Sequence, residues 1–179
     1  MDYLLLLRGI NVGGNNRVSM ADMRTYLSES GFEDTKSYIN SGNLFFKSDL
    51  GISKINDKVS QILTDNYDFK IPFVILSKDT FLNSLEQVPS WWGEDKTLRH
   101  NALFKLNDYD SDLDNWLTEH ITDYDQISIN ENVILWTSTL KINFSKSFYS
   151  KIMGTPLYKQ TSARNFNTTN KLKNIFNER

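Results

Sequence analysis

The chain has 179 residues, enough for one domain or two small ones. It is 39% hydrophobic and contains 11 Phe, 8 Tyr and 4 Trp, a composition that excludes an intrinsically disordered chain. The net charge of −2 favours no class of partner, and the absence of cysteine excludes disulfides, thiolate metal sites and thiol catalysis.

The first half of the chain shows six predicted elements in the order strand, helix, strand, strand, helix, strand. Four signals indicate their positions: a continuous apolar run, Ser19 as a helix N-cap, the turn sequence Asn40-Ser41-Gly42-Asn43, and helical spacing of apolar residues. The elements span residues 3–7, 20–30, 36–39, 44–47, 52–63 and 71–76. This order is typical of a ferredoxin-like arrangement.

The pattern begins again after a connection at residues 90–96. The predicted elements are a strand at 100–106, a helix at 113–121, strands at 126–130 and 133–137, and helices at 147–153 and 168–176. We therefore predict an α+β protein with two ferredoxin-like subdomains and antiparallel sheets, residues 1–88 and residues 97–179, the second ending in a C-terminal helix.

Charge is unevenly distributed along the chain. Residues 141–179 contain eight basic residues and one acid, a net charge of +7 against −9 for residues 1–140. Such segregation either indicates an anionic partner or neutralises the acidic part of the folded chain itself.

A loop rich in glycine and asparagine, residues 9–16, joins the first strand to the first helix. Its backbone amides, with those of the helix N-terminus, are suited to hold an anion. The loop lacks the Gly-Lys-Ser/Thr of a P-loop and the spacing of a dinucleotide fingerprint. The alternative is a connection in which Gly13 and Gly14 serve only to allow positive φ.

The predicted topology brings further polar residues to this loop. The first and third strands of a ferredoxin-like sheet are antiparallel neighbours, so the chain near Arg8 and Asn11 should lie beside Asn40, Ser41 and Asn43. These side chains are mostly hydrogen-bond donors without a carboxylate nearby in sequence, which favours binding of a carboxylate or phosphate over proton transfer. Alternatively, they bond to one another and fix the loop.

Two motifs resemble the signatures of the domain-of-unknown-function 1697 family. The opening signature is Leu6-Leu7-Arg8-Gly9-Ile10-Asn11-Val12-Gly13-Gly14, followed by Tyr38-x-x-Ser41-Gly42-Asn43. The closing signature is Arg164-Asn165-Phe166-x-Thr168-x-x-Lys171-Leu172. The resemblance implies two ferredoxin-like subdomains in a bacterial, cytoplasmic protein, and it implies no activity.

Signatures at both ends of the chain suggest that the ends meet. Arg164, Asn165 and Lys171 would then approach Arg8 and Asn11 and complete the ligand site. The alternative is a structural role, in which Arg164-Asn165 caps the last helix. The chain departs from the family at Ser162-Ala163, where Thr-Thr is usual, and at Phe166, where Trp is usual.

Other motifs do not support a metal or cofactor. Asp108, Asp110, Asp112 and Glu119 match part of the calcium-loop spacing, but Leu113 stands where that loop requires glycine. His100 and His120 lack the spacing of a metal or catalytic motif. We expect no metal and no cofactor.

We consider three functions, in the order in which the sequence favours them. The first is binding of a small anionic ligand, phosphate- or carboxylate-bearing and possibly a nucleotide. The second is nucleic-acid binding through the basic C-terminal segment, with Phe45 and Phe46 as stacking residues, although the RNP1 pattern is absent. The third is an enzyme using Ser41 or Ser145-Lys146, for which no orienting group is identified. The apolar run at 3–7 is too short for a membrane span, so we expect no membrane partner and a cytoplasmic location. The sequence makes no prediction of oligomeric state.

Overall fold

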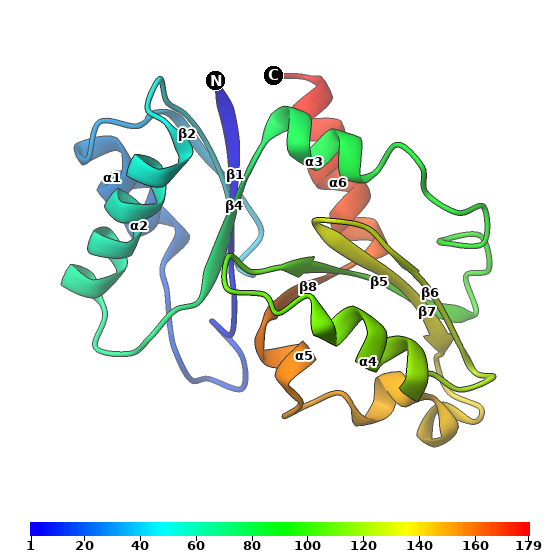
Figure 1. The fold of residues 1–179 in the computed structure, drawn as a ribbon. Coiled ribbons are helices and arrows are strands. Elements are labelled where there is room, and N and C mark those ends of the chain that lie inside the picture. Colours follow the sequence, from blue (N-terminus) through cyan, green and yellow to red (C-terminus); the bar gives the residue numbers. More distant parts are fainter. The chain divides into compact units, whose positions relative to one another are not determined.

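The computed structural model describes residues 1–179 (Figure 1), which form two compact units. The first contains Met1–Phe81 and also Arg179, and the second contains Leu82–Glu178. The units divide inside a helix at Phe81, whereas the sequence suggests subdomains at 1–88 and 97–179.

The first unit is a four-stranded antiparallel sheet with strand order β2-β3-β1-β4. This order places β1 between β3 and β4, as a ferredoxin-like topology requires. Its elements are β1 (Asp2–Leu7), α1 (Met20–Glu29), β2 (Glu33–Tyr38), β3 (Asn43–Lys47), α2 (Ile52–Asn66), β4 (Phe73–Ser77) and α3 (Lys78–Ser84).

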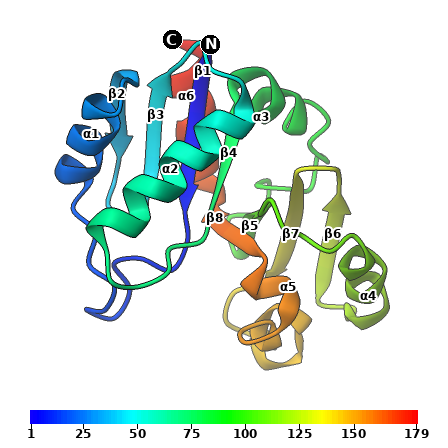
Figure 2. The same cartoon turned by 60° about the vertical axis from the view of Figure 1, so that its left-hand side comes forward.

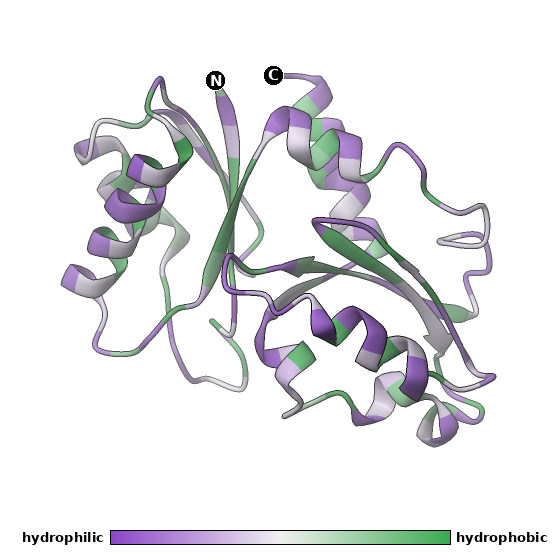
Figure 3. Cartoon of the chain, viewed as in Figure 1, coloured by the Kyte–Doolittle hydropathy of each residue, from purple (hydrophilic) through white to green (hydrophobic).

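The core of the first unit lies between the sheet and the pair α1 and α2, which cover one face of it (Figure 2). Side chains alternate between the faces of a strand, so Leu5 and Leu7 of β1 point to the same side and pack with Met23 of α1 and Val59 of α2. Figure 3 shows β1 and β4 as largely hydrophobic strands, while α2 carries both kinds of residue. Leu4 and Leu6, on the other face of β1, are also completely buried.

The second unit repeats the same sheet order, β6-β7-β5-β8, and all of its strand pairs are antiparallel. Helices α4 and α5 lie on one face of this sheet and α6 on the other (Figure 1). Its elements are β5 (Leu98–Lys105), α4 (Asp112–His120), β6 (Asp125–Ile129), β7 (Val133–Thr139), the 3-10 helices η1 (Phe144–Lys146) and η2 (Phe148–Lys151), α5 (Pro156–Lys159), β8 (Thr161–Asn165) and α6 (Phe166–Asn177).

The core beneath α4 is built around Trp136 of β7, which is completely buried. It packs with Leu103 of β5, Leu117 of α4 and Leu157 of α5. The Trp136 indole donates to the buried carboxylate of Asp125 over 2.9 Å, so the polar end of the ring is satisfied inside the core.

The structure confirms the α+β class and the two similar four-stranded halves, but it corrects several elements. Strand β8 and helix α5 were not expected, because β8 reads Thr-Ser-Ala-Arg-Asn and lacks the apolar alternation of a strand. The expected helix at 147–153 is instead the short 3-10 helix η2, whose N-cap Ser147 accepts from the Ser150 amide. Helix α3 was also missed, since it is only seven residues long.

None of the helices combines the length and the apolar character needed to cross a bilayer.

The last residue, Arg179, is a buried part of the first unit. Its side chain is 4% exposed and forms ion pairs with Asp2 (2.9 Å) and with Asp34 (3.2 Å), and it also donates to the Asp34 carbonyl. Burial raises the pKa of the Asp34 carboxyl, but the Lys36 hydrogen bond and the charges of Arg179, Lys36 and Lys47 outweigh it. The pKa of Asp34 is therefore held below its usual 3.8.

Arg179→Gln is expected to destabilise the protein at neutral pH, and the loss should shrink in acid. A carboxyl with a lowered folded pKa contributes stability above its unfolded pKa and loses it as the pH falls through the folded value. We expect the difference in Tm between wild type and Arg179→Gln to be constant from pH 7 to pH 5 and to narrow below about pH 4. A difference that is the same at pH 3 as at pH 7 would show that the Arg179 pairs do not contribute through charge.

Candidate functional site: a pocket beside the Gly/Asn loop

The Gly/Asn loop is a succession of residues with left-handed backbone. Gly9, Asn11, Gly13, Gly14 and Asn16 all have φ between +49° and +80°. Val12 and Asn15 form an isolated bridge, and the Asn11 amide donates to the Asn16 carbonyl over 3.0 Å. Glycine and asparagine are the residues that tolerate this conformation, so the composition of the loop follows from its shape.

The Asn11 side chain fixes the loop to its surroundings. Its Nδ2 donates to the carbonyls of Val18 (2.9 Å) and Asn40 (2.8 Å), and its Oδ1 accepts from the Val18 amide (2.9 Å). Asn11 and Asn40 are therefore brought together as the topology suggests. Three bonds to backbone groups give Asn11 a structural role in holding the loop against the hairpin.

The β2–β3 hairpin contributes the next predicted residues. The Leu6–Asn43 pairing and the 2.8 Å bond from the Leu7 amide to the Gly42 carbonyl confirm that the end of β1 lies beside the start of β3. Asn43 is completely buried, and its Nδ2 donates to the Tyr38 carbonyl and to Ser41 Oγ, each over 3.0 Å. Asn43 is thus engaged in shaping the turn.

A pocket of about 720 Å³ lies beside the loop and the N-terminus of α1. Two arginines, Arg17 and Arg24, contribute to its wall, and no acidic side chain does. Arg17 is exposed and makes no hydrogen bond or ion pair, while Arg24 donates to Ser37 Oγ. We call this cavity the loop pocket, and its lining is Asn11, Gly14, Arg17, Val18, Ser19, Met20, Ala21, Arg24, Ser37, Ile39 and Asn40.

The loop pocket includes only part of the predicted site. Asn11, Gly14 and Asn40 line it, whereas Arg8, Gly13, Ser41 and Asn43 do not. Arg17 and Arg24 were not singled out from the sequence, because arginines on either side of a helix start are usually read as surface residues. In a helix that begins at Met20, Arg24 lies one turn later on the same side. This spacing was the sequence signal that could have placed Arg24 near the start of the helix.

The closing-signature residues lie in the second unit. Asn165 caps α6 by accepting from the Thr168 amide over 2.8 Å, and Lys171 is exposed. Arg164 is 7% exposed and donates to Ser162 Oγ and to the Ala163 carbonyl. Burial lowers the pKa of Arg164 to about 10, so its guanidinium stays charged at neutral pH.

A family model matches the greater part of the chain. The family model described as a protein of unknown function, DUF1697, matches residues 1–135. The chain belongs to the DUF1697 family. The match contains the whole opening signature, and the closing signature lies beyond it.

A solved structure has the same fold over nearly the whole chain. The conserved bacterial protein SP0830 from Streptococcus pneumoniae is 33% identical, with a TM-score of 0.89 over 98% of each chain. Comparison with curated proteins gives no match. Membership of DUF1697 therefore gives the fold and leaves the activity to be inferred from the side chains.

Both departures from the DUF1697 signature are accommodated in the second unit. Ser162 keeps the hydroxyl that accepts from Arg164 over 3.0 Å, so only the second hydroxyl of the usual pair is lost, at Ala163. Phe166 packs edge-on against Trp92 with ring centroids 4.9 Å apart, so an aromatic contact is retained without an indole donor.

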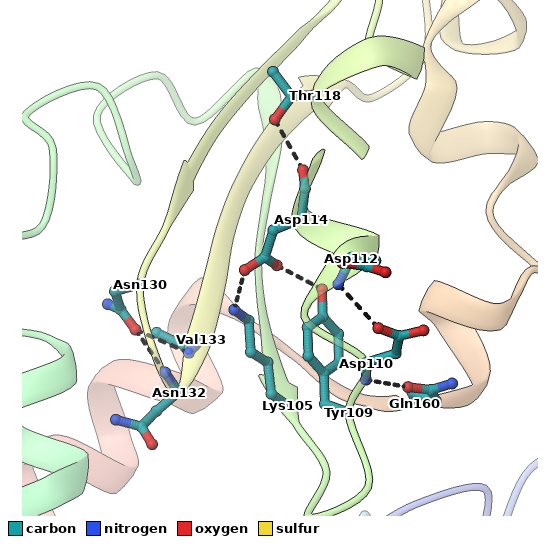
Figure 4. Close-up of polar contacts among 10 residues, drawn as sticks. All are labelled: Lys105, Tyr109, Asp110, Asp112, Asp114, Thr118, Asn130, Asn132, Val133 and Gln160. Atoms are coloured by element: carbon teal, nitrogen blue, oxygen red, sulfur yellow. Dashed lines mark hydrogen bonds and ion pairs between the residues drawn. The ribbon is translucent and has the colours of Figure 1, made fainter. Parts of the chain in front are cut away.

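Asp110, Asp112 and Asp114 of the acidic motif take part in hydrogen bonds (Figure 4). The Asp110 carboxylate accepts from the Asp112 amide, and Asp114 accepts from Lys105 Nζ (2.8 Å) and the Tyr109 hydroxyl (2.7 Å). Burial, together with the hydrogen bond and charge of Asp114, raises the pKa of Tyr109. No three or more His, Asp or Glu side chains are grouped so that they could hold a metal ion.

Lys105→Met is expected to destabilise the second unit. The Lys105 side chain is 8% exposed and Asp114 28%, so removing the ammonium leaves a half-buried carboxylate with one partner fewer. We expect a loss of about 2 kcal/mol, reduced from the value for a fully buried pair by solvent at Asp114. In urea unfolding, the double variant Lys105→Met/Asp114→Leu should recover part of this loss. A double variant as unstable as the sum of the two single ones would exclude a coupled pair.

The aromatic residues suggested for base stacking are not accessible. Phe45 is 1% exposed, and Phe46 is fully buried against Phe32, with ring centroids 4.6 Å apart. Side chains that stack on bases must present a free ring face. Phe45 and Phe46 therefore serve the core.

Proposed function

We propose that the protein binds a small anionic ligand, carrying a phosphate or carboxylate group, in the loop pocket. The observation that carries this proposal is the wall of the pocket, which contains two guanidinium groups and no carboxylate. A guanidinium offers a planar set of donors that matches the oxygens of carboxylate and phosphate.

The surroundings of the two arginines support an anion as the ligand. Ser19, Met20 and Ala21, the residues at the start of α1, line the same pocket, where the helix dipole adds partial positive charge. Asp22, the acid in the first turn, is not part of the lining. The Gly/Asn loop holds this geometry through Asn11 rather than by offering its own side chains to the ligand.

The pocket volume sets the size of the ligand. About 720 Å³ falls within the range of small-molecule sites and exceeds the space that a single phosphate ion needs. Ile39 is 48% exposed and lines the pocket, so part of the wall is apolar. A nucleotide or another phosphorylated metabolite matches this combination of charge and apolar surface.

Thermal unfolding in the presence of candidate ligands tests the proposal. Inorganic phosphate, pyrophosphate, AMP and citrate at 10 mM are suitable probes. A ligand with a Kd of about 1 mM would add about 1.4 kcal/mol to the stability of the folded protein, which is a rise of several degrees in Tm. We expect the rise to be reduced in Arg17→Gln and abolished in Arg17→Gln/Arg24→Gln.

Lys70→Gln is the matched control, because Lys70 is an exposed cation of the same unit outside the pocket. It should respond to ligand as the wild type does. Absence of stabilisation by every probe, or an equal response of the double arginine variant, would reject the proposal. Binding of single-stranded RNA with a steep decrease in affinity at higher salt would favour the nucleic-acid alternative instead.

A further inference from the structure

One end of the second sheet contains buried polar atoms that have no hydrogen-bond partner. They are Arg99 Nε and Asn101 Nδ2 on β5, with Ser138 Oγ and Thr139 Oγ1 on β7. More than nine in ten buried polar groups in folded proteins are paired, and each unpaired one costs stability. Four at one place require an explanation, such as a ligand that supplies the missing acceptor.

Three of these atoms lie on the same face of the sheet. Arg99 and Asn101 are two residues apart on β5, so their side chains point to the same side. Ser138 is paired directly with Arg99 across the strands and therefore shares this face. All three groups can donate hydrogen bonds, and an oxyanion accepts several such bonds at once.

The Arg99 guanidinium has no carboxylate partner. It lies over the rings of Phe144 (4.9 Å) and Tyr149 (5.7 Å), and it forms no ion pair. The acid on the same face is Asp125, paired with Ser138 across the sheet, but its oxygens already accept from Trp136 and from the backbone amides of η2. The charge of Arg99 is therefore left for another anion.

A pocket of about 660 Å³ is lined by Arg99 and Asn101, whereas Ser138 and Thr139 lie outside its lining. Strand β8 ends opposite Asn101, so it does not pair with the start of β5, and the twelve-residue helix α6 begins there. The wall contains two cations, Lys96 and Arg99, and no acid. We call this cavity the sheet-end pocket, and its lining is Gly93, Lys96, residues 98–101, Leu140 and residues 165–167.

We propose that the sheet-end pocket is a second ligand site, separate from the loop pocket, that binds the oxyanion of a small amphiphilic molecule. Arg99 and Asn101 donate to the oxyanion, and Lys96 and the start of α6 add positive potential. Leu140, which is 38% exposed, provides an apolar wall for the remainder of the ligand.

The arginine Nε–H signals in NMR spectra provide a direct test. Phenyl phosphate and phenylacetate present the same ring with a phosphate or a carboxylate, and inorganic phosphate lacks the ring. We expect phenyl phosphate or phenylacetate to shift the Arg99 signal, with inorganic phosphate binding at least about fivefold more weakly because it buries no apolar surface. The Arg17 and Arg24 signals report on the loop pocket, so the proposals for the two sites are tested separately.

Two variants distinguish ligand binding from a structural role. Arg99→Gln should raise the Kd at least about tenfold, the loss of a hydrogen bond to a charged group, whereas Lys159→Gln, an exposed cation of the same unit, should not change it. Asn101→Leu removes an unpaired buried donor, so it should leave the Tm of the free protein unchanged or higher and still weaken binding. An unshifted Arg99 signal at 50 mM of every probe, or unchanged affinity in Arg99→Gln, would overturn the proposal.

Discussion

Asp125→Ala is expected to lower the free energy of unfolding of the second unit by about 4 kcal/mol. The carboxylate is 7% exposed and accepts from the Trp136 indole, the Thr122 hydroxyl and amide, and the amides of Phe148 and Tyr149. Removing it leaves several buried donors without an acceptor and frees the chain segment that follows β7. For a unit of this size we expect Tm to fall by at least about 15 °C.

The control for Asp125 lies two residues earlier. Asp123 is exposed and forms no hydrogen bond or ion pair, so Asp123→Ala should change the stability by no more than about 0.5 kcal/mol. Calorimetry of both variants, with the near-ultraviolet circular dichroism of Trp136 as a local readout, is the measurement. A loss below about 1 kcal/mol in Asp125→Ala would mean that water replaces the carboxylate at little cost.

Gly42→Ala is expected to destabilise the first unit by about 3 kcal/mol or more. Gly42 has φ of +79°, and a Cβ added there would lie 2.6 Å from Leu7 Cβ. Leu7 Cβ is fixed by the backbone of β1, so no side-chain rotation relieves the overlap. The turn would have to move away from β1 and lengthen the bond from the Leu7 amide to the Gly42 carbonyl.

Gly13→Ala separates the effect of backbone strain from the effect of steric overlap. Gly13 has φ of +60° with no atom within 4 Å of an added Cβ, so alanine adds backbone strain without overlap. We expect a loss of about 1 kcal/mol, the usual cost of placing a non-glycine residue in this conformation. Denaturant unfolding of both variants is the test, and equal losses would contradict the importance of the contact with Leu7.

Most elements of the fold were predictable because their determinants are local. The apolar run at 3–7, the Ser19 cap and the helical spacing after Ile52 each reflect contacts within a few residues, and β1, α1 and α2 appear where those signals predict. Strand β8 was missed because its residues, Thr-Ser-Ala-Arg-Asn, lack the apolar alternation of a strand and only its pairing with β5 defines it. One of its side chains is that of Arg164, a charged residue that is buried only because of the tertiary fold.

The site was predictable only in part. The loop conformation follows from its glycines and asparagines, and the antiparallel neighbours β1 and β3 brought Asn11 and Asn40 together as expected. The sequence left open whether Asn11 and Asn43 bind a ligand or fix the loop. In the structure their Nδ2 groups donate to backbone carbonyls, and Arg17 and Arg24 line the pocket. Which donors are already satisfied depends on distances between segments that the sequence does not specify.

By itself, the sequence determined the α+β class, the two similar halves and the resemblance to DUF1697, because periodicity, turns and signatures are properties of the chain order. Only the tertiary structure decided which polar groups are free to bind. Arg99 and Asn101 became part of a candidate site because the fold leaves Arg99 Nε and Asn101 Nδ2 buried without a hydrogen-bond partner at the wall of a pocket. Nearly all buried polar groups in a folded protein are hydrogen-bonded to a partner. An unpaired donor can therefore be recognised only when the positions of all possible partners are known.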